Sequence, residues 1–260
     1  MHPRLPAQAL LELIEQRRFG VEYQPVLALA DGAIIGYEAL ARFYDAHGRA
    51  LAPQQVFDSL HSSPLSLFQV EYEMKRLQLA HAPREAGRLF VNLDPDAFQV
   101  AAADESHPLV ALLAARPGVV VEIIENSSIN DADLSDAMVA AFAGTPVELA
   151  LDDIGAPHTM LSLPILLAVD FLKFDRSWIL HPDDPVRVAA LRHLVAFARE
   201  CGKQTILEGI EHEWQRAFAA AIGFDHVQGF LYRHLFRSTG CLAAVGEGTP
   251  GAGAALPAAA

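Results

Sequence analysis

Short apolar runs that end on one polar residue recur along this chain, with helical patterns between them. Residues 118–121 lead into Glu122, for example, and residues 147–151 lead into the pair Asp152-Asp153. Alternating strands and helices form parallel strands, which present their C-terminal ends on one face of the fold. We therefore expect the residues that end the runs to gather on that face. They are Glu38, Asn92, Glu122, Asp152, Asp153, Lys173, Glu208 and, after a weaker run, Gln228.

The charges of this set indicate a metal site. Apart from Gln228, five carboxylates lie beside one carboxamide and one lysine, and the carboxylates would repel one another unless cations lay among them. A single acidic residue after a strand is more often a solvated loop residue or a helix cap, and Glu208 and Glu211 could simply favour the positive end of a helix. Their recurrence at the same strand edge is what carries the inference.

The order of the predicted elements favours an α/β fold with a closed, TIM-like barrel. Asp31-Gly32 is a hairpin turn signal between the first two strands, which should therefore be antiparallel. About eight strands with helices between them fit a (β/α)₈ barrel. An open doubly wound sheet is the competing arrangement, but no Gly-rich phosphate motif follows a strand. The predicted strands cover residues 21–29, 33–38, 88–92, 118–123, 147–152, 169–173 and 203–208.

Two helices have clear boundaries in the sequence. The first covers residues 185–201, where Asp184 can cap the start and Gly202 suits the end. The second begins near Glu211 and ends at Gly223. Both have apolar residues at helical spacing, so each should pack one face against a core.

The composition is that of one large domain followed by a tail. A hydrophobic content of 52% is ample for a buried core over residues 1–242. Residues 243–260 are rich in Ala, Gly and Pro and cannot bury a core, which predicts a disordered tail.

Charge and apolar patterning exclude some environments. A net charge of −13 without a basic stripe argues against binding to nucleic-acid polymers. No apolar stretch reaches the roughly 20 residues that a membrane span needs, and residues 1–20 predict an amphipathic helix rather than a secretory signal. Cys201 and Cys241 give no disulfide framework. The expected location is therefore the cytoplasm, without membrane insertion.

Eight motifs in order resemble those of EAL domains, which are cyclic di-GMP phosphodiesterases named for the Glu-Ala-Leu seen at 38–40. The resemblance runs from about Leu10 to Leu235 and implies a modified (β/α)₈ barrel with an antiparallel first strand. The motifs are Tyr23-Gln24-Pro25, Tyr37-Glu38-Ala39-Leu40-Ala41-Arg42, Val91-Asn92, Val121-Glu122, Asp152-Asp153, Phe171-Leu172-Lys173-Phe174-Asp175, Glu208-Gly209-Ile210-Glu211 and Gln228-Gly229-Phe230.

The resemblance implies two divalent cations. One would be held by Glu38, Asn92, Glu122 and Asp152. Asp152 would also bridge to a second cation, held with Asp153 and Glu208. Since all these ligands are oxygens, Mg²⁺ or Mn²⁺ is expected. The 11 histidines look scattered, without zinc spacing, and we interpret most of them as surface or core polar residues.

The resemblance also implies a reaction and its substrate contacts. Cyclic di-GMP would be opened to linear pGpG, with Lys173 orienting or deprotonating the attacking water. Arg42 would bind a phosphate, and Gln24 and Gln228 would contact the ligand. Glu211 would brace the loop after the paired aspartates. A homodimer is expected, since family members often dimerise near that loop.

That loop, residues 154–160, departs from the family pattern. Pro157 replaces a glycine, and Thr159 and Met160 replace two serines. The departure motivates an alternative function, a catalytically weak or inactive receptor or interaction module for cyclic di-GMP. A third hypothesis, made without the family, is a barrel enzyme that abstracts a proton next to a carboxylate, using Lys173 as base and one metal.

Overall fold

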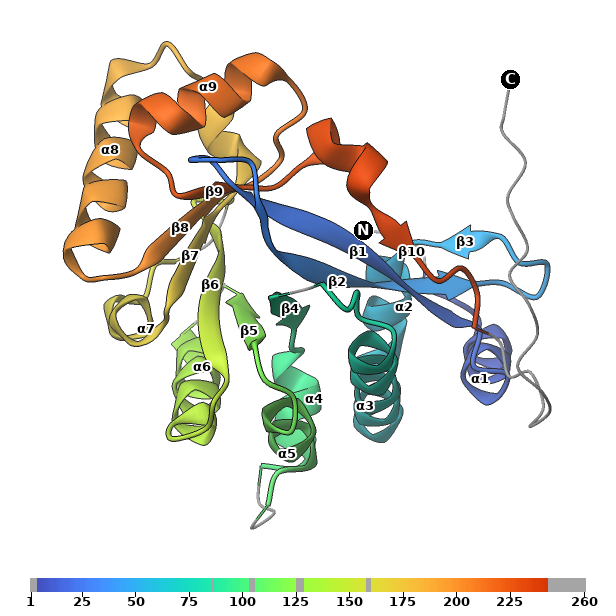
Figure 1. Cartoon of the computed structure of the whole chain (residues 1–260). Helices are drawn as coiled ribbons and strands as arrows, with labels where there is room; N and C mark the ends of the chain where they lie inside the picture. Colours follow the sequence, from blue (N-terminus) through green and yellow to red (C-terminus); the bar gives the residue numbers. More distant parts are fainter. Residues whose placement is uncertain (1–3, 86, 103–105, 125–128, 158–159, 243–260) are drawn as a thin grey trace, which may run out of the picture.

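The computed structural model of the chain describes residues 4–85, 87–102, 106–124, 129–157 and 160–242 (Figure 1). The predicted tail and residues 158–159 of the altered loop lie outside this range, so the division into a domain at 1–242 and a tail stays a prediction.

Within the described residues, ten strands form one sheet, and eight of them close into a barrel. β1 is antiparallel to both of its barrel neighbours, β2 and β9, and the other barrel pairs are parallel. The predicted barrel with an antiparallel first strand is confirmed. The strands are β1 Phe19–Ala28, β2 Ile34–Tyr44, β3 Ala50–Leu51, β4 Arg88–Asn92, β5 Val119–Ile124, β6 Glu148–Ile154, β7 Phe171–Phe174, β8 Gln204–Leu207, β9 His226–Val227 and β10 Arg237–Ser238.

The first hairpin forms where Asp31-Gly32 predicts it, and Gly32 takes a positive φ of 74° at the turn. β2 continues to Tyr44, beyond the predicted end at residue 38. The reason is its pairing with β1, which extends to Phe19 opposite Phe43. Arg42 therefore lies within the strand rather than in a loop after it.

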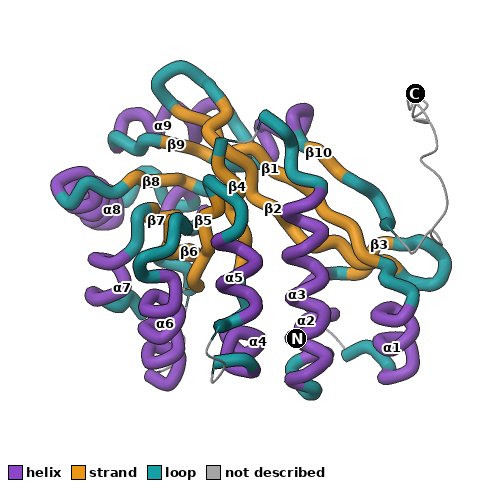
Figure 2. Tube along the Cα trace, turned by 60° about the horizontal axis from the view of Figure 1, so that its bottom comes forward, coloured by secondary structure: helices purple, strands orange, loops and turns teal. Residues whose placement is uncertain are grey.

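Helices lie along the outside of the barrel, as Figures 1 and 2 show for α3 to α6 beneath the strands. α8 matches its predicted start, because the Asp184 carboxylate accepts from the amides of Val186 and Arg187. α9 starts two residues after Glu211 and ends at Gly223 in the left-handed region. The helices are α1 Ala7–Glu15, α2 Pro53–Leu60, α3 Pro64–Ala80, α4 Pro95–Val100, α5 Pro108–Ala114, α6 Ile129–Phe142, α7 Leu163–Ala168, α8 Pro185–Glu200 and α9 Glu213–Ile222, with 3₁₀ turns η1 Arg176–Ile179 and η2 Phe230–Leu235.

The barrel separates two apolar cores. The larger core fills the space between the strands and the helices outside them. The smaller one fills the barrel with side chains from six strands, and the rings of Phe90 and Phe171 meet there edge to face at 5.2 Å. This inner layer closes the floor beneath the C-terminal ends of the parallel strands. Its members are Val26, Phe90, Val120, Ala150, Phe171 and Ile206.

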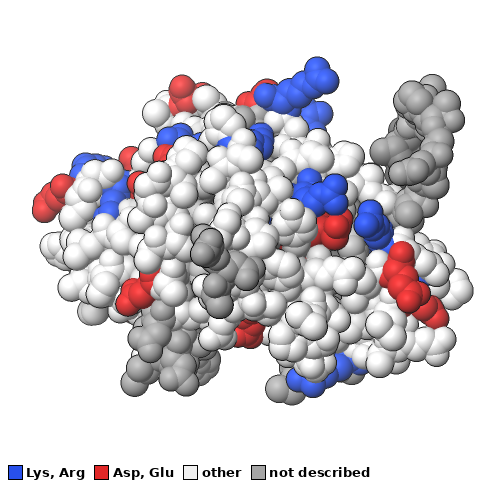
Figure 3. Space-filling model, turned by 90° about the horizontal axis from the view of Figure 1, so that it is seen from below, with Lys and Arg blue, Asp and Glu red and all other residues white. Residues whose placement is uncertain are grey.

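Two features of the described residues concern the surface. No helix in the described ranges is long and apolar enough to cross a bilayer. On the face shown in Figure 3, Lys and Arg lie in separate groups with Asp and Glu between them, rather than in one basic stripe.

Candidate active site

A ring of eight polar side chains lies directly above the inner apolar core. Residues two apart in a strand share a face, so the residue two positions after Phe90 is Asn92, and the one after Phe171 is Lys173. β1 runs the other way, and there Gln24 precedes Val26. Each barrel strand supplies one member: β4 to β9 supply it from their last residues or directly after their end, whereas Gln24 and Glu38 lie in the middle of β1 and β2. The ring is Gln24, Glu38, Asn92, Glu122, Asp152, Lys173, Glu208 and Gln228.

Lys173 occupies the centre of this ring and is fully buried. Its Nζ lies 2.5 Å from Glu122 Oε1, 2.9 Å from Glu208 Oε1 and 3.1 Å from Asp152 Oδ1. Glu38 Oε2 is 3.8 Å away. Four of the five predicted carboxylates thus converge on one ammonium group.

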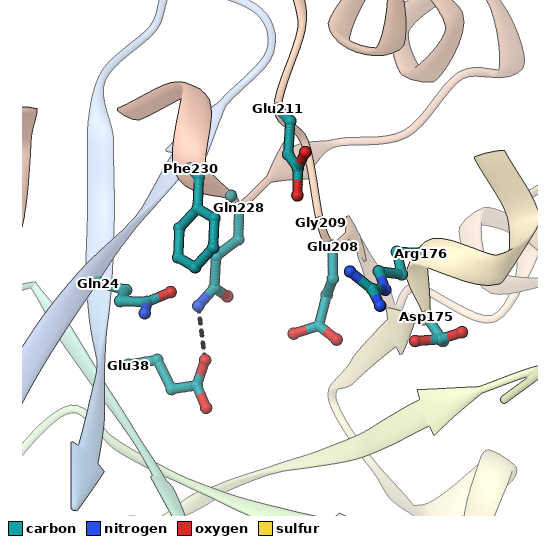
Figure 4. A pocket seen from close by; sticks show the side chains of 10 residues that line it. Gln24, Glu38, Asp175, Arg176, Glu208, Gly209, Glu211, Gln228 and Phe230 are labelled. Carbon is teal, nitrogen blue, oxygen red and sulfur yellow. Dashed lines mark hydrogen bonds between the residues drawn. The ribbon is translucent and has the colours of Figure 1, made fainter. Parts of the chain in front are cut away.

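Two amides fix the orientation of Glu38. Asn92 Nδ2 donates to Glu38 Oε1 at 3.0 Å, and Gln228 Nε2 donates to Glu38 Oε2 at 2.5 Å (Figure 4). Because both amides are neutral, β2, β4 and the end of β9 meet at Glu38 without additional charge. Gly229, the residue after Gln228, leaves no room for a side chain, because a Cβ there would lie 2.1 Å from the carbonyl oxygen of Ile210.

A bulge at the end of β6 brings both aspartates to the rim. The pairing of β6 with β7 shifts between Leu151 and Ile154, and Asp153 takes a positive φ of 60°, which is uncommon for a residue other than glycine. Consecutive residues of a regular strand would face opposite sides. Here the carboxylate atoms of Asp152, Asp153 and Glu208 lie within 4.8 Å of one another.

Burial makes this concentration of negative charge costly. It raises the pKa of Glu122 and of Glu208 well above the usual range, and neighbouring carboxylates add to the effect. Burial and the adjacent Asp152 raise the pKa of Asp153 to about 6. The pKa of Asp152 is raised chiefly by burial. In the absence of cations, protons would therefore neutralise part of the ring.

The pKa values of Lys173 and Glu38 shift in the directions that keep both groups charged. Burial by itself would lower the pKa of Lys173, but the carboxylates led by Asp152 and Glu122 outweigh it and raise that pKa well above its usual value. Burial would raise the pKa of Glu38, yet Lys173 and the amides of Gln228 and Asn92 bring it below the usual value. Without bound cations, Lys173 is a proton donor rather than a base at neutral pH.

The donor set fits hard divalent cations. Among the described side chains, both oxygens of Glu122 and Oδ1 of Asp152 are buried without a hydrogen-bond partner, although Lys173 is within ion-pair distance. Unsatisfied buried carboxylate oxygens suit Mg²⁺, Mn²⁺ or Ca²⁺ rather than metals that prefer thiolates. One lysine leaves most of the negative charge of five ionised carboxylates unbalanced.

Two cavities flank the pair formed by Glu38 and Asn92. The first, of about 250 Å³, is lined by Gln24, Glu38, Glu208 and Gln228 among others (Figure 4). The second, of about 460 Å³, lies between β2, α2, α3 and the start of α4, and Asn92 lines it. An elongated ligand could therefore extend to both sides of the ring.

Arg42 lines the second cavity but is paired with Glu22, a carboxylate that the sequence analysis does not select. Its Nη2 lies 2.5 Å from Glu22 Oε1, and Gln24 Nε2 donates to the same oxygen at 3.2 Å. Glu22, Gln24, Glu38 and Arg42 share one face of the β1–β2 hairpin. The only sequence signal for Glu22 is its position two residues before Gln24.

The predicted bracing role of Glu211 stays a prediction. Its side chain is exposed and lines the first cavity, and its backbone amide donates to Gln215 Oε1 at 2.6 Å. The base of the altered loop is packed, because Trp178 Nε1 donates to the carbonyl of Ile154 at 2.8 Å and the indole lies against Gly155.

With this geometry in place, comparison with known proteins identifies the family. A model described as the EAL domain matches residues 7–234. The chain belongs to the EAL domain family. The EAL-domain relatives include the probable cyclic di-GMP phosphodiesterase PdeB of Escherichia coli K12, 26% identical over 238 residues that cover 87% of this chain and 44% of PdeB. The chain spans less than half the length of the curated relatives first matched.

Solved EAL-domain structures show the same fold. The PaMucR phosphodiesterase in complex with c-di-GMP aligns with a TM-score of 0.66 at 24% identity, over 86% of this chain and 94% of that one. The YkuI protein of Bacillus subtilis, with an EAL domain and in complex with substrate c-di-GMP and calcium, aligns with a TM-score of 0.68 at 20% identity, over 88% and 57%. These likenesses establish the architecture around the ring.

Proposed function

We propose that this chain hydrolyses cyclic di-GMP to linear pGpG with the help of two divalent cations, Mg²⁺ or Mn²⁺. The observation that carries the proposal is the buried ring, in which carboxylates from four strands converge on Lys173. The named phosphodiesterase relatives and the c-di-GMP complexes of structural neighbours support the choice of substrate.

Five residues of the ring, together with Asp153, would form two cation-holding groups. Glu38, Asn92, Glu122 and Asp152 would hold one cation. Asp152 would be shared with the second, together with Asp153 and Glu208, whose carboxylates already lie close together. When bound, such a pair of ions supplies charge for the phosphoryl oxygens and lowers the pKa of water to near neutral.

The other side chains position substrate and protons. Arg42 is a planar fork donor suited to one phosphate, once it exchanges Glu22 for that phosphate. Gln24 and Gln228 line the cavity as hydrogen-bonding groups. Lys173, protonated and buried, donates towards the water or the developing negative charge. Cavities on both sides of Glu38 and Asn92 offer space for the two halves of a dinucleotide.

A homodimer is part of the same proposal. Exposed apolar side chains gather beside the altered loop and along α7, where a second copy could cover them. They are Met160, Leu161, Leu163 and Leu167.

A hydrolysis assay tests the proposed activity. Purified chain with cyclic di-GMP and saturating Mn²⁺ should release pGpG, and chelation of the metal should stop the release. Glu38→Ala should lower the rate by at least about a hundredfold, since it removes a metal ligand and the acceptor of two amides. Glu15→Ala, a change at the exposed last residue of α1, is the matched control.

Binding measured in parallel separates hydrolysis from sensing. If cyclic di-GMP binds equally well with and without metal and no pGpG forms at any metal concentration, the chain is a receptor and the hydrolase proposal is wrong.

A further inference from the structure

His61, Asp94 and Asp96 come together outside the ring. His61 follows the last residue of α2, Asp94 precedes α4, and Asp96 lies in the first turn of α4. His61 Nε2 is 3.1 Å from Asp94 Oδ2 and 3.4 Å from Asp96 Oδ2. One nitrogen from the end of α2 and two oxygens from the start of α4 thus lie within 4.8 Å of one another.

The contact from His61 to Asp96 matches the separation between two ligands of one small cation. Zn²⁺ binds nitrogen and oxygen at about 2.0–2.2 Å in a tetrahedral arrangement, which puts two ligands roughly 3.3–3.5 Å apart. A hydrogen bond between imidazole and carboxylate is usually shorter than the contact from His61 to Asp96, at about 2.7–3.2 Å. The contact to Asp96 therefore has the spacing of two ligands of one cation, whereas the contact to Asp94 at 3.1 Å also fits a hydrogen bond.

A contact outside the cluster orients His61 as metal-binding histidines are oriented. Its Nδ1 lies 2.8 Å from the carbonyl oxygen of Phe57, and because a carbonyl can only accept, Nδ1 carries the proton. In the neutral imidazole, Nε2 then directs its lone pair at two carboxylates, and the lone pair and the negative charges repel each other. A cation between them would bind to both. A hydrogen bond from the other imidazole nitrogen is the usual support of a histidine ligand.

Asp94 is fixed in place as well, and its side chain is only 15% exposed. Oδ1 accepts from the amide of Ala97 at 3.0 Å, which leaves Oδ2 to face His61. The backbone amide of Asp94 donates to Glu71, which is itself paired with Lys75 at 2.8 Å. The position of Oδ2 is thus set by the fold before any ligand binds.

The basic side chains nearest the cluster already pair with carboxylates outside it. Arg42 and Lys75 line the same 460 Å³ cavity as His61 and Asp94, but they pair with Glu22 and Glu71. In the part of the chain that the structure describes, the ion pairs of Asp94 and Asp96 are with His61. A small cation would therefore meet uncompensated negative charge here.

We propose that His61, Asp94 and Asp96 form a separate binding site for a Zn²⁺-type divalent cation at the wall of the second cavity. The mixed nitrogen and oxygen ligands favour Zn²⁺ or Co²⁺ over Mg²⁺, in contrast to the all-oxygen ring. Three protein ligands leave the fourth position to water or to another small donor. Bound metal joins the end of α2 to the start of α4.

The difference in metal preference allows the two sites to be measured apart. The full chain is saturated with Mg²⁺ to fill the ring and is then titrated with Zn²⁺ by calorimetry. Co²⁺ is titrated in parallel, and its visible absorption reports tetrahedral coordination. The wild-type chain should take up one equivalent of Zn²⁺ that His61→Ala does not. Asp96→Asn should weaken that equivalent at least about tenfold.

A control variant and the exposure of Asp96 make the experiment decisive. His193→Ala removes an exposed histidine from α8 and should leave the uptake unchanged. Asp96 is 61% exposed, so Asp96→Asn should fold even if His61→Ala does not. Two outcomes would overturn the proposal: equal Zn²⁺ uptake by the wild type and both cluster variants, or no Zn²⁺ uptake beyond that of the ring. Either would mean that His61 is only an ion-pair partner of the two aspartates.

Discussion

At the scale of single residues, Arg42 and Gln24 show that a candidate binding group can be occupied by its own neighbour. Both contact Oε1 of Glu22, so a phosphate that enters must replace a carboxylate of the same hairpin. Each side chain of the ion pair is about a quarter exposed. Partly exposed pairs of this kind contribute roughly 0–1 kcal/mol, which corresponds to at most about a fivefold effect on affinity.

Glu22→Gln should therefore lower KM for cyclic di-GMP two- to fivefold without changing kcat, because Arg42 becomes easier to recruit. Steady-state kinetics measures this. Glu85→Gln is the matched control, because it removes the same charge from an exposed pair with Arg237. A KM that stays constant or rises in Glu22→Gln would show that Glu22 does not compete with the substrate.

The residues that the sequence identified and those that it missed differ in a physical way. Glu122 and Lys173 each follow an apolar run, and the period of two puts them above the inner core. Glu22 lies inside a strand, where an acidic residue looks like part of a solvated face. His61 and Asp94 lie far apart in the sequence and meet only because the end of α2 and the start of α4 line the same cavity.

At the scale of elements, β-strand lengths were harder to predict than their order. The end predicted for β2 at residue 38 is wrong because polar residues on the ligand-facing side interrupt the apolar run, while the backbone stays paired with β1 as far as Phe43. Short β3 and β10 were missed as well, since two-residue strands have no periodicity of their own.

The turn after β9 provides an element-scale prediction. Gly229→Ala would place a methyl group 2.1 Å from the carbonyl oxygen of Ile210, so the strand end that carries Gln228 must move. We expect a loss of more than about 2 kcal/mol of stability, a Tm lower by roughly 4–8 °C, and at least tenfold lower activity.

Gly202→Ala is the control for this change. Gly202 also has a positive φ, of 71°, but nothing lies within 4 Å of a Cβ built there. Its cost should be confined to backbone strain of about 1 kcal/mol. Equal shifts of Tm in the two variants, measured by thermal unfolding, would show that crowding at Ile210 is not what constrains Gly229.

At the scale of the whole molecule, the ring links stability to pH and to metal. The pKa of Asp153 is about 6 in the fold against 3.8 as its ordinary value, so between these values the folded chain holds more protons than the unfolded chain. The contribution of this group is therefore greatest at low pH and is lost as the pH rises through about 6. The raised pKa values of Glu122 and Glu208 act in the same direction.

Metal should reverse this loss, because cations replace the protons. At a Mn²⁺ concentration 100-fold above its Kd, stabilisation is about 2.7 kcal/mol, which raises Tm by roughly 5–10 °C for a chain of this size. The rise should be larger at pH 8 than at pH 5. Asp153→Asn should flatten the pH dependence of the metal-free chain, and a metal effect that is independent of pH would contradict this account.

The antiparallel β1 also determines when the site can exist during synthesis. β9 closes the barrel between β8 and β1, so the earliest and the latest barrel segments to leave the ribosome must join before the circle is complete. Until then Glu38 lacks the amide of Gln228, and the barrel that holds the carboxylates around Lys173 is open between β8 and β1. A nascent chain that stalls before Val227 cannot assemble the ring. Cation uptake by the ring should therefore follow the closure of the barrel, which is the final step of folding.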